Sequence, residues 1–271
     1  MNAPKLVVLD LDGTVVRHST KPTTPSREVV KALAAVKAAG VPVAIATGRA
    51  PWGALRTAAD LGLVDGLVSA SHGAVTFDLG TSKITESHVF DPSVAVAAFT
   101  RANAATAFAV EVQNGWRHTA NFNRDFHSEW ADIVDVATLS ATQTARLAAR
   151  LPGGARYGAG ARCPVASDLA LQAALDPEMY CVEVGFNGWI DVGPPGITKA
   201  TGVAAIAGHY GVTAEETIVF GDAANDLPMF AWAGHAVAMG QAVPEIQAAA
   251  DEIAPSVEHD GVARVLRRWF P

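Results

Sequence analysis

The sequence predicts an α/β fold in which a doubly wound parallel-sheet core carries an inserted α+β domain. Three observations predict this fold. At both ends of the chain, short apolar runs that end at polar residues alternate with helical patterns, as in a parallel sheet. The middle of the chain carries two Asn-Gly signals, which are typical of antiparallel hairpins. Segments rich in glycine and proline separate the two kinds of pattern.

The first strand–helix–strand unit is predicted near the N-terminus. The runs Lys5 to Leu9 and Val41 to Ala46 have the length of buried strands. Between them we expect a helix that has Thr24 as its cap and Pro25 at its first position, and that ends at Gly40.

A similar pattern is repeated toward the C-terminus. A helix is predicted from about Thr198 to Tyr210, and Gly211 ends it. The strand Thr217 to Phe220 follows and ends at Gly221-Asp222. The two ends of the chain are therefore expected to form one sheet.

The middle of the chain is predicted to be an α+β unit made of two αββ halves. Each half has a helical pattern, Pro92 to Asn103 or Ser167 to Leu175, followed by two strands around an Asn-Gly turn. The strand pairs are Ala107 to Gln113 with Trp116 to Phe122, and Met179 to Phe186 with Trp189 to Val192. The shared Val-Glu-Val and Asn-Gly-Trp letters leave duplication and convergence equally open.

The domain boundaries follow from the linkers. Gly80 lies on one side of the middle region, and Gly193-Pro194-Pro195-Gly196 lies on the other. We expect residues 1–79 and 193–271 to form the core and residues 80–192 to form an inserted cap.

Composition excludes several classes of protein. Half of the 271 residues are hydrophobic and 17% are charged, with a mean hydropathy of +0.21, which excludes a disordered chain, a collagen-like repeat and a coiled coil. The formal net charge of −7 argues against a protein that binds nucleic acid or acidic lipid.

The location is expected to be cytoplasmic. Cys163 and Cys181 form no metal or disulfide framework, and the N-terminus lacks the pattern of a signal peptide. The longest stretch without Asp, Glu, Lys or Arg, Leu227 to Pro244, is interrupted by proline and glycine and is interpreted as buried loops and a short helix. No membrane association is expected.

Polar side chains follow three of the predicted strands. Asp10, Thr47 and Asp222 each lie just past a strand, and open α/β sheets bind ligands at that edge. Asp10 and Asp12 are close enough to repel each other, and a hard divalent cation such as Mg²⁺ relieves this repulsion. Asp222 and Asp226 supply further acidic groups. One carboxylate is then suited to attack, and its neighbour to proton transfer.

A phosphoryl group needs positive charge and N–H donors. Lys199 near a helix start, and the Thr47 hydroxyl with Gly48 behind it, supply them. The chain therefore carries the chemistry expected for a phosphorylated substrate.

These residues resemble the four ordered motifs of the haloacid dehalogenase (HAD) superfamily. The motifs are Asp10-Leu11-Asp12-Gly13-Thr14, Thr47-Gly48-Arg49, Lys199, and Gly221-Asp222-Ala223-Ala224-Asn225-Asp226. Further segments are similar to the Cof-type subfamily, which carries a type IIB cap between motifs two and three: Gly196-Ile197-Thr198-Lys199, Pro228-Met229, Val237-Ala238-Met239-Gly240 and Asp260-Gly261-Val262-Ala263.

The resemblance implies a Mg²⁺-dependent phosphatase that acts on a small phosphorylated metabolite, such as a sugar phosphate, through an aspartyl-phosphate. By it, Asp10 is the nucleophile and Asp12 the general acid/base. The implied phosphate-binding residues are Thr47, Gly48, Lys199 and Asn225, and the implied metal ligands are Asp10, Asp12, Asp222 and Asp226. A phosphotransferase or mutase on the same fold, and a non-catalytic phosphometabolite sensor, are the alternatives.

The sequence departs from the subfamily pattern at two positions. His72-Gly73-Ala74 stands where Asn-Gly-Ala is usual, and Gly240-Gln241-Ala242 stands where Gly-Asn-Ala is usual. Neither departure falls within the four motifs, so the expected reaction is not put in doubt. His72 is either a residue facing the leaving group or, as the more ordinary reading, a hydrogen-bonded loop histidine. In the cap, Arg124 and His127 are the preferred candidates to contact the substrate. The sequence gives no indication of the oligomeric state.

Overall fold

The computed structural model describes residues 2–18, 24–113, 115–123, 130–153, 162–185 and 187–271. The chain divides into two compact units. The core unit comprises Met1–Glu86 and Thr198–Pro271, and the cap unit comprises Ser87–Ile197. Each unit is described by itself.

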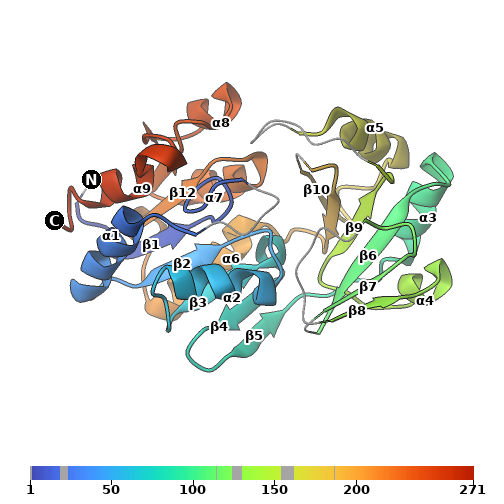
Figure 1. The fold of residues 1–271 in the computed structure, drawn as a ribbon, viewed down its shortest axis with the longest axis horizontal. Helices are drawn as coiled ribbons and strands as arrows, with labels where there is room; N and C mark the ends of the chain where they lie inside the picture. Colours follow the sequence, from blue (N-terminus) through green and yellow to red (C-terminus); the bar gives the residue numbers. More distant parts are fainter. Residues whose placement is uncertain (1, 19–23, 114, 124–129, 154–161, 186) are drawn as a thin grey trace. The chain divides into compact units, whose positions relative to one another are not determined.

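The core unit is built on an eight-stranded sheet with the order β14-β13-β12-β1-β2-β3-β4-β5 (Figure 1). The pairs from β14 to β3 are parallel, and β4 joins β3 antiparallel. The strands are β1 (Leu6–Leu9), β2 (Val43–Ala46), β3 (Leu67–Ala70), β4 (Val75–Asp78), β5 (Lys83–Ser87), β12 (Thr217–Gly221), β13 (His235–Ala238) and β14 (Glu252–Ile253).

Helices cover both faces of this sheet. Leu6 and Val8 of β1 belong to an apolar cluster with residues of two helices, α6 and α7, while the alternating Val7 and Leu9 are equally buried on the opposite face. Helices α1 and α9 lie side by side (Figure 1). The α-helices are α1 (Arg27–Ala38), α2 (Pro51–Asp60), α6 (Lys199–Tyr210), α7 (Leu227–Trp232), α8 (Pro244–Ala248) and α9 (Gly261–Leu266), and the short 3₁₀ turns are η1 (Ser71–Gly73), η2 (Ala214–Glu216), η3 (Ala224–Asp226) and η4 (Val257–His259). The doubly wound α/β core predicted from the sequence is confirmed.

One predicted helix start is wrong. The cap of α1 is Ser26, whose side chain accepts a hydrogen bond from the Val29 N–H at 3.2 Å. Thr24 and Pro25 precede the helix, because Ser26 keeps the extended backbone of a capping residue, with φ −69° and ψ 154°. The predicted end at Gly40, with φ +76°, is confirmed.

The start of α6 agrees with the sequence prediction. Thr198 caps the helix, and its N–H donates to the Thr201 hydroxyl at 3.1 Å. Gly211, with φ +64°, ends it. Lys199 is therefore fixed in the first turn of a capped helix.

The cap unit has a six-stranded sheet with the order β10-β11-β9-β6-β7-β8. Helices α3 and α5 pack against each other, and their apolar residues form one core with the sheet, in which Phe99, Phe108, Leu147 and Leu169 are buried. The elements are α3 (Ser93–Ala102), β6 (Ala107–Val112), β7 (Gly115–His118), β8 (Trp130–Ile133), α4 (Val136–Ser140), β9 (Leu147–Arg150), α5 (Pro164–Ala173), β10 (Cys181–Val184) and β11 (Ile190–Gly193).

Both predicted hairpins are present, as the antiparallel pairs β6–β7 and β10–β11. Three further elements, β8, α4 and β9, do not appear in the predicted pair of αββ halves. β9 lies between β11 and β6 in the sheet, but its sequence Leu-Ala-Ala-Arg has little strand propensity. The core unit also continues past residue 79, because β5 extends its sheet as far as the Glu86 boundary, and residues 193–197 belong to the cap unit.

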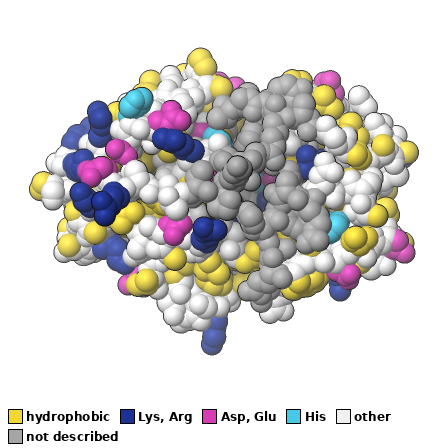
Figure 2. Space-filling view, in the orientation of Figure 1, with side chains coloured by type: hydrophobic (Ala, Val, Ile, Leu, Met, Phe, Trp, Pro, Cys, Tyr) yellow, Lys and Arg dark blue, Asp and Glu magenta, His cyan; other side chains and the backbone are white. Residues whose placement is uncertain are grey.

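The surface carries mixed charges. On the face seen in Figure 2, basic and acidic side chains of the core unit lie interspersed, as in the exposed pair of Lys37 and Asp65, 2.8 Å apart. Within the described residues, no helix has both the length and the apolar character needed to cross a membrane. The uncharged stretch from Leu227 to Pro244 forms α7 and the strand β13, so its interpretation as loops and a short helix missed one strand.

Candidate active site

The carboxyl ends of three adjacent parallel strands bring the predicted residues together. β1 lies between β12 and β2, and Leu9 is in register with Phe220 and with Ile45. Asp10, Thr47 and Asp222 follow these three strands and are buried. The juxtaposition expected from the order of strands and polar residues is present in the structure.

Lys199 joins two of the acidic residues. Its Nζ donates hydrogen bonds of 2.6 Å to Asp10 Oδ1 and of 2.6 Å to Asp226 Oδ1, and all three side chains are buried. Burial by itself lowers the pKa of a lysine, but the charges of Asp10 and Asp226 raise the pKa of Lys199 above its ordinary value. Lys199 therefore carries a permanent positive charge at this point of the sheet edge.

Asp226 organises the loop after β12. Its Oδ2 accepts hydrogen bonds from the backbone N–H groups of Asp222 at 2.9 Å and Ala223 at 3.0 Å. Gly221 permits this turn, because a Cβ there would lie only 2.4 Å from Asp226 Cγ. Both oxygens of Asp226 therefore have donors within the core unit.

Asp222 is held through one oxygen only. Its Oδ2 accepts a hydrogen bond from His18 Nε2 at 2.9 Å and lies 3.4 Å from the Gln241 amide nitrogen. Its Oδ1 is buried and has no hydrogen-bond partner among the described residues. Burial raises the pKa of Asp222, the hydrogen bond and charge of His18 lower it, and Asp226 raises it, with a raised pKa as the result.

The acidic cluster fits a divalent cation. One ligand atom from each of Asp10, Asp222 and Asp226 lies within 4.8 Å of the others. A buried carboxylate oxygen without a donor is costly, by about 1–3 kcal/mol, unless a cation satisfies it. Asp222 Oδ1 is such an atom, so the donor set suits a hard, oxygen-liganded ion.

The nucleophile candidate has a perturbed acidity. The pKa of Asp10 is raised to about 7, chiefly by burial; the charge of Lys199 opposes this rise, and the charges of Asp226 and Asp222 add to it. A bound cation acts in the opposite direction, since positive charge favours the ionised carboxylate.

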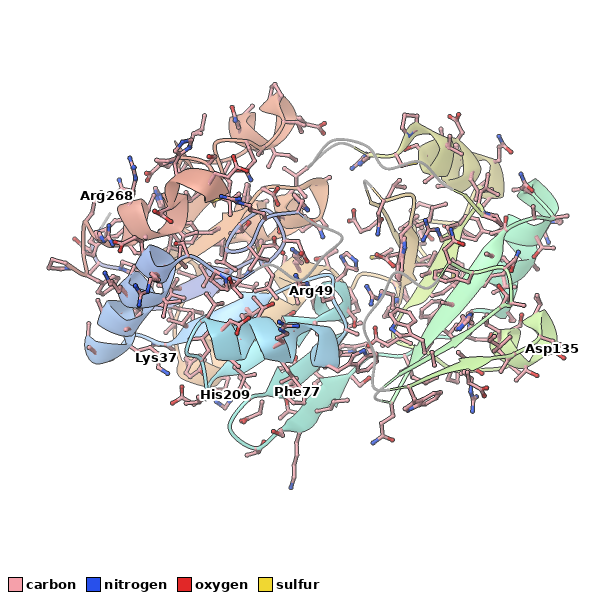
Figure 3. All side chains as sticks on the ribbon, in the orientation of Figure 1. Lys37, Arg49, Phe77, Asp135, His209 and Arg268 are labelled. Atoms are coloured by element: carbon pink, nitrogen blue, oxygen red, sulfur yellow. The ribbon has the colours of Figure 1, made fainter. Side chains whose placement is uncertain are left out.

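Asp12 is not part of the buried cluster of Asp10, Asp222 and Asp226. Its carboxylate pairs with the Arg49 guanidinium through two hydrogen bonds, of 2.6 Å to Nε and 2.5 Å to Nη2, and 38% of its side chain is exposed. Arg49, labelled in Figure 3, also donates to the Gly53 carbonyl and the Thr57 hydroxyl. Sequence reasoning included Arg49 in a motif but assigned it no partner.

His72 contacts residues of two of the motifs. Its Nδ1 accepts a hydrogen bond of 3.4 Å from the Asn225 amide, and a Cβ on Gly48 would lie 2.5 Å from its ring. Ser71 and His72 both have positive φ, of 51° and 57°, a strained conformation for residues other than glycine. The hydrogen-bonded loop histidine is the interpretation that this contact favours.

Gln241 also reaches the motifs. Its amide nitrogen donates to the Gly13 carbonyl at 2.6 Å, and its amide oxygen accepts from the Val257 N–H at 3.0 Å. Both residues that depart from the subfamily pattern therefore contact motif residues in space, although neither belongs to a motif.

The remaining predicted residues are placed as follows. Thr47 is buried, and its hydroxyl accepts the Arg49 N–H at 3.2 Å. Asn225 Oδ1 is buried with no hydrogen-bond partner among the described residues. Arg124 and His127 lie outside the described residues, so their proposed contacts stay predictions. The geometry thus brings carboxylates, a buried lysine and a donor set suited to a cation together at one sheet edge.

The chain belongs to the haloacid dehalogenase-like hydrolase family, whose model matches residues 7–142 and 170–266. The resemblance seen in the four motifs is thereby confirmed.

Curated relatives support the same family. The chain is 41% identical over 81 residues to the 5-amino-6-(5-phospho-D-ribitylamino)uracil phosphatase YitU of Bacillus subtilis, covering 30% of each chain. It is 23% identical over 266 residues to the phosphoglycolate phosphatase of Methanothermobacter thermautotrophicus, covering 98% of this chain and 99% of the relative. The matches to the first curated relatives span 30% or less of their length.

Solved structures show the same fold over nearly the whole chain. A structure described as the HAD subclass IIB sugar phosphatase BT4131 superposes with a TM-score of 0.79 at 23% identity, covering 98% of both chains. A haloacid dehalogenase-like hydrolase from B. subtilis superposes with a TM-score of 0.79 at 19% identity, covering 97% of this chain and 99% of the other.

Proposed function

We propose that the protein is a Mg²⁺-dependent phosphatase that hydrolyses a small phosphorylated metabolite through an aspartyl-phosphate on Asp10. The observation that carries the proposal is the cluster of three buried carboxylates around Lys199, in which Asp222 Oδ1 is left without a hydrogen bond among the described residues. Membership of a hydrolase family and relatives named as phosphatases support the same reaction.

In the first half of the reaction, an oxygen of Asp10 attacks the phosphorus of the substrate. The new O–P bond forms as the bond between phosphorus and the ester oxygen breaks, and Asp12 gives its proton to the leaving oxygen. Lys199 orients Asp10 through Oδ1 and, with the Thr47 hydroxyl, Gly48 and Asn225, offers positive charge and hydrogen bonds to the phosphoryl oxygens.

In the second half, water attacks the aspartyl-phosphate. Asp12 takes the proton from this water, inorganic phosphate leaves, and Asp10 is regenerated. Both oxygens of Asp12 accept hydrogen bonds from the Arg49 guanidinium. Asp12 must therefore turn away from Arg49 before one of its oxygens can contact the leaving group or the water.

Mg²⁺ would be held by Asp10, Asp222 and Asp12, the last through its backbone carbonyl, with Asp226 completing the acidic set. When bound, it neutralises charge on the carboxylates and on the phosphoryl group. The chain's own residues supply the nucleophile, the proton transfer and the orientation of the phosphate.

The substrate class is a phosphomonoester of a small metabolite. The named relatives act on a ribitylamino-uracil phosphate and on phosphoglycolate, and one structural neighbour is called a sugar phosphatase. These three chemistries define the first compounds to test.

The test is phosphate release from a panel of sugar phosphates, flavin-precursor phosphates and phosphoglycolate, with Mg²⁺ and with EDTA. Asp10→Asn is expected to abolish turnover, and Asp65→Asn, which changes an exposed carboxylate of the same unit, is expected to leave it unchanged. Turnover that survives in EDTA or in Asp10→Asn would refute the proposal. Transfer of the phosphoryl group to a second hydroxyl, without free phosphate, would replace hydrolysis by phosphotransfer.

A further inference from the structure

The starting observation is an unequal environment of the two Asp222 oxygens. Oδ2 accepts the hydrogen bond from His18 and lies near the Gln241 amide, whereas Oδ1 is buried with no hydrogen-bond partner among the described residues. An ionised carboxylate only accepts hydrogen bonds, so His18 Nε2 carries the hydrogen. The carboxylate is thereby fixed through one oxygen, and the other is the one available to a cation.

His18 reaches Asp222 because the loop after β1 turns back on itself. The Gly13 N–H donates to the Val16 carbonyl at 2.6 Å, and the Thr14 N–H donates to the Leu11 carbonyl at 3.2 Å. This turn returns the chain toward the end of β12, and 11% of the His18 side chain is exposed there. His18 lies outside the four motifs, and 204 residues separate it from Asp222 in the sequence.

Gly13 makes the contact possible. It has φ +86°, and a Cβ at this position would lie 2.1 Å from Asp222 Oδ2 and 2.4 Å from His18 Nε2. The His18–Asp222 hydrogen bond therefore lies directly against the backbone of the first motif. Gln241, from another loop, also holds the backbone of Gly13, because its amide donates a hydrogen bond to the Gly13 carbonyl.

We propose that His18 is a positioning residue for the metal site, which holds Asp222 Oδ2 by a hydrogen bond and so presents Oδ1 to the divalent cation. This inference rests on the proposed function. Metal ligands are commonly oriented by such hydrogen bonds, and losing one typically weakens metal binding by about 10- to 100-fold.

A purely structural role for His18 makes a different prediction. If the imidazole only filled space, leucine, which is of similar size, would keep the wild-type affinity for the metal. If its N–H is what matters, His18→Leu loses metal affinity, and His18→Gln, whose amide places an N–H at a comparable distance from the backbone, keeps it.

The experiment is calorimetric titration of the metal-free, full-length protein with MgCl₂, for the wild type, His18→Leu and His18→Gln. The control is His235→Leu, because His235 makes a comparable pair with Glu252, 3.1 Å apart, in the same unit but outside the acidic cluster. Thermal unfolding in EDTA checks that each variant is folded.

We expect Mg²⁺ to bind His18→Leu about 10- to 100-fold more weakly than the wild type, and to bind His18→Gln and His235→Leu within about 3-fold of it. Wild-type affinity in His18→Leu would overturn the proposal. Equal weakening in His18→Gln would also overturn it and would point to a direct role of the imidazole.

The same titration separates this inference from the proposed function. A wild type that binds Mg²⁺ and releases phosphate, together with an unaffected His18→Leu, would refute only the role of His18. A wild type that binds Mg²⁺ but hydrolyses nothing, together with a weakened His18→Leu, would refute only the phosphatase. A wild type that binds no Mg²⁺ would overturn both.

Discussion

Each of the two units buries a group of charged side chains, here called the core group and the cap group. The two groups differ in the ratio of acidic to basic side chains. In the core unit, the carboxylates of Asp10 and Asp226 share one ammonium, that of Lys199, and Asp222 adds a third buried carboxylate. In the cap unit, Arg146 donates to Glu111 at 3.2 Å and lies 3.8 Å from Asp191.

The surroundings differ as well. In the cap unit, Asp191 lies on β11 and Glu111 on β6, and Arg146 directly precedes β9, the strand between them. The Arg146 guanidinium also stacks 4.8 Å from the centre of the Trp116 ring. The core group lies where strands end, and one of its oxygens, Asp222 Oδ1, has no hydrogen bond from the described residues. Removing the guanidinium of the cap group leaves buried carboxylates without their counter-charge and destabilises the fold, whereas the acidic excess at the strand ends of the core unit costs stability and suits a cation.

The largest effect is expected from breaking the cap group. Arg146→Leu leaves the buried carboxylate of Glu111 without its guanidinium, and we expect the free energy of unfolding to fall by about 3–5 kcal/mol. Urea denaturation measures it. The double variant Arg146→Leu/Glu111→Leu is expected to recover much of the loss. A change below about 1 kcal/mol in the single variant would remove the contrast between the two groups.

Crowding the core group is expected to affect activity more than stability. Gly13→Ala places a Cβ against Asp222 Oδ2, which moves the carboxylate away from its hydrogen bond with His18. We expect kcat/KM for phosphate release to fall by about 100-fold, since misplacement of about 1 Å at a reacting centre has this effect. Gly62→Ala, at a residue that also has positive φ but open space around it, controls for backbone strain. Equal losses in the two variants would contradict the account.

The acidic excess predicts a particular pH dependence in the metal-free protein. Because the folded pKa of Asp10 is raised from 3.8 to about 7, the folded state binds more protons than the unfolded state between these values, and stability falls as pH rises through this window. Asp10→Asn removes this contribution. In EDTA at pH 8, the variant is expected to be more stable than the wild type by about 4 kcal/mol, because each unit of pKa between 3.8 and about 7 corresponds to about 1.4 kcal/mol.

Denaturation curves at pH 3.5, 5 and 8 test the direction in which stability changes with pH. The advantage of Asp10→Asn is expected to shrink as pH falls below 7 and to vanish near 3.8. A wild type that gains stability between pH 5 and 8 relative to the variant would show that Asp10 is not held in the way described.

The smallest effect is expected at the surface. Lys37, labelled in Figure 3, pairs with Asp65, whose side chain is 71% exposed. Lys37→Ala is expected to change the unfolding free energy by about 0.5 kcal/mol or less, with unchanged phosphate release, because water screens such a pair. A loss comparable to that of Arg146→Leu would show that burial is not what separates the groups.

The sequence predicts those parts of the site that local patterns control. Asp10 and Asp222 were identified because each follows a short apolar run, and the parallel order of the strands brings such ends together. Lys199 was placed correctly because Thr198 and Gly211 mark the ends of its helix.

Contacts that depend on the path of a loop could not be predicted in this way. His18 meets Asp222 only because the loop after β1 turns back. His72 meets Gly48 through the positive φ of residues 71–73, a conformation that the residue type does not indicate at Ser71. The strand β9 was not predicted because its residues have a weak strand propensity, which pairing with β11 and β6 overrides.

The central claim is that Asp10 is phosphorylated during turnover. It is tested most directly by quenching the protein with acid during hydrolysis of its best substrate in the presence of Mg²⁺, followed by mass spectrometry of the peptide that contains Asp10 and Asp12. The account predicts a phosphoryl adduct on Asp10 that is absent in EDTA and in Asp10→Asn. Rapid phosphate release with no adduct on Asp10, or with the adduct on another residue, would contradict it.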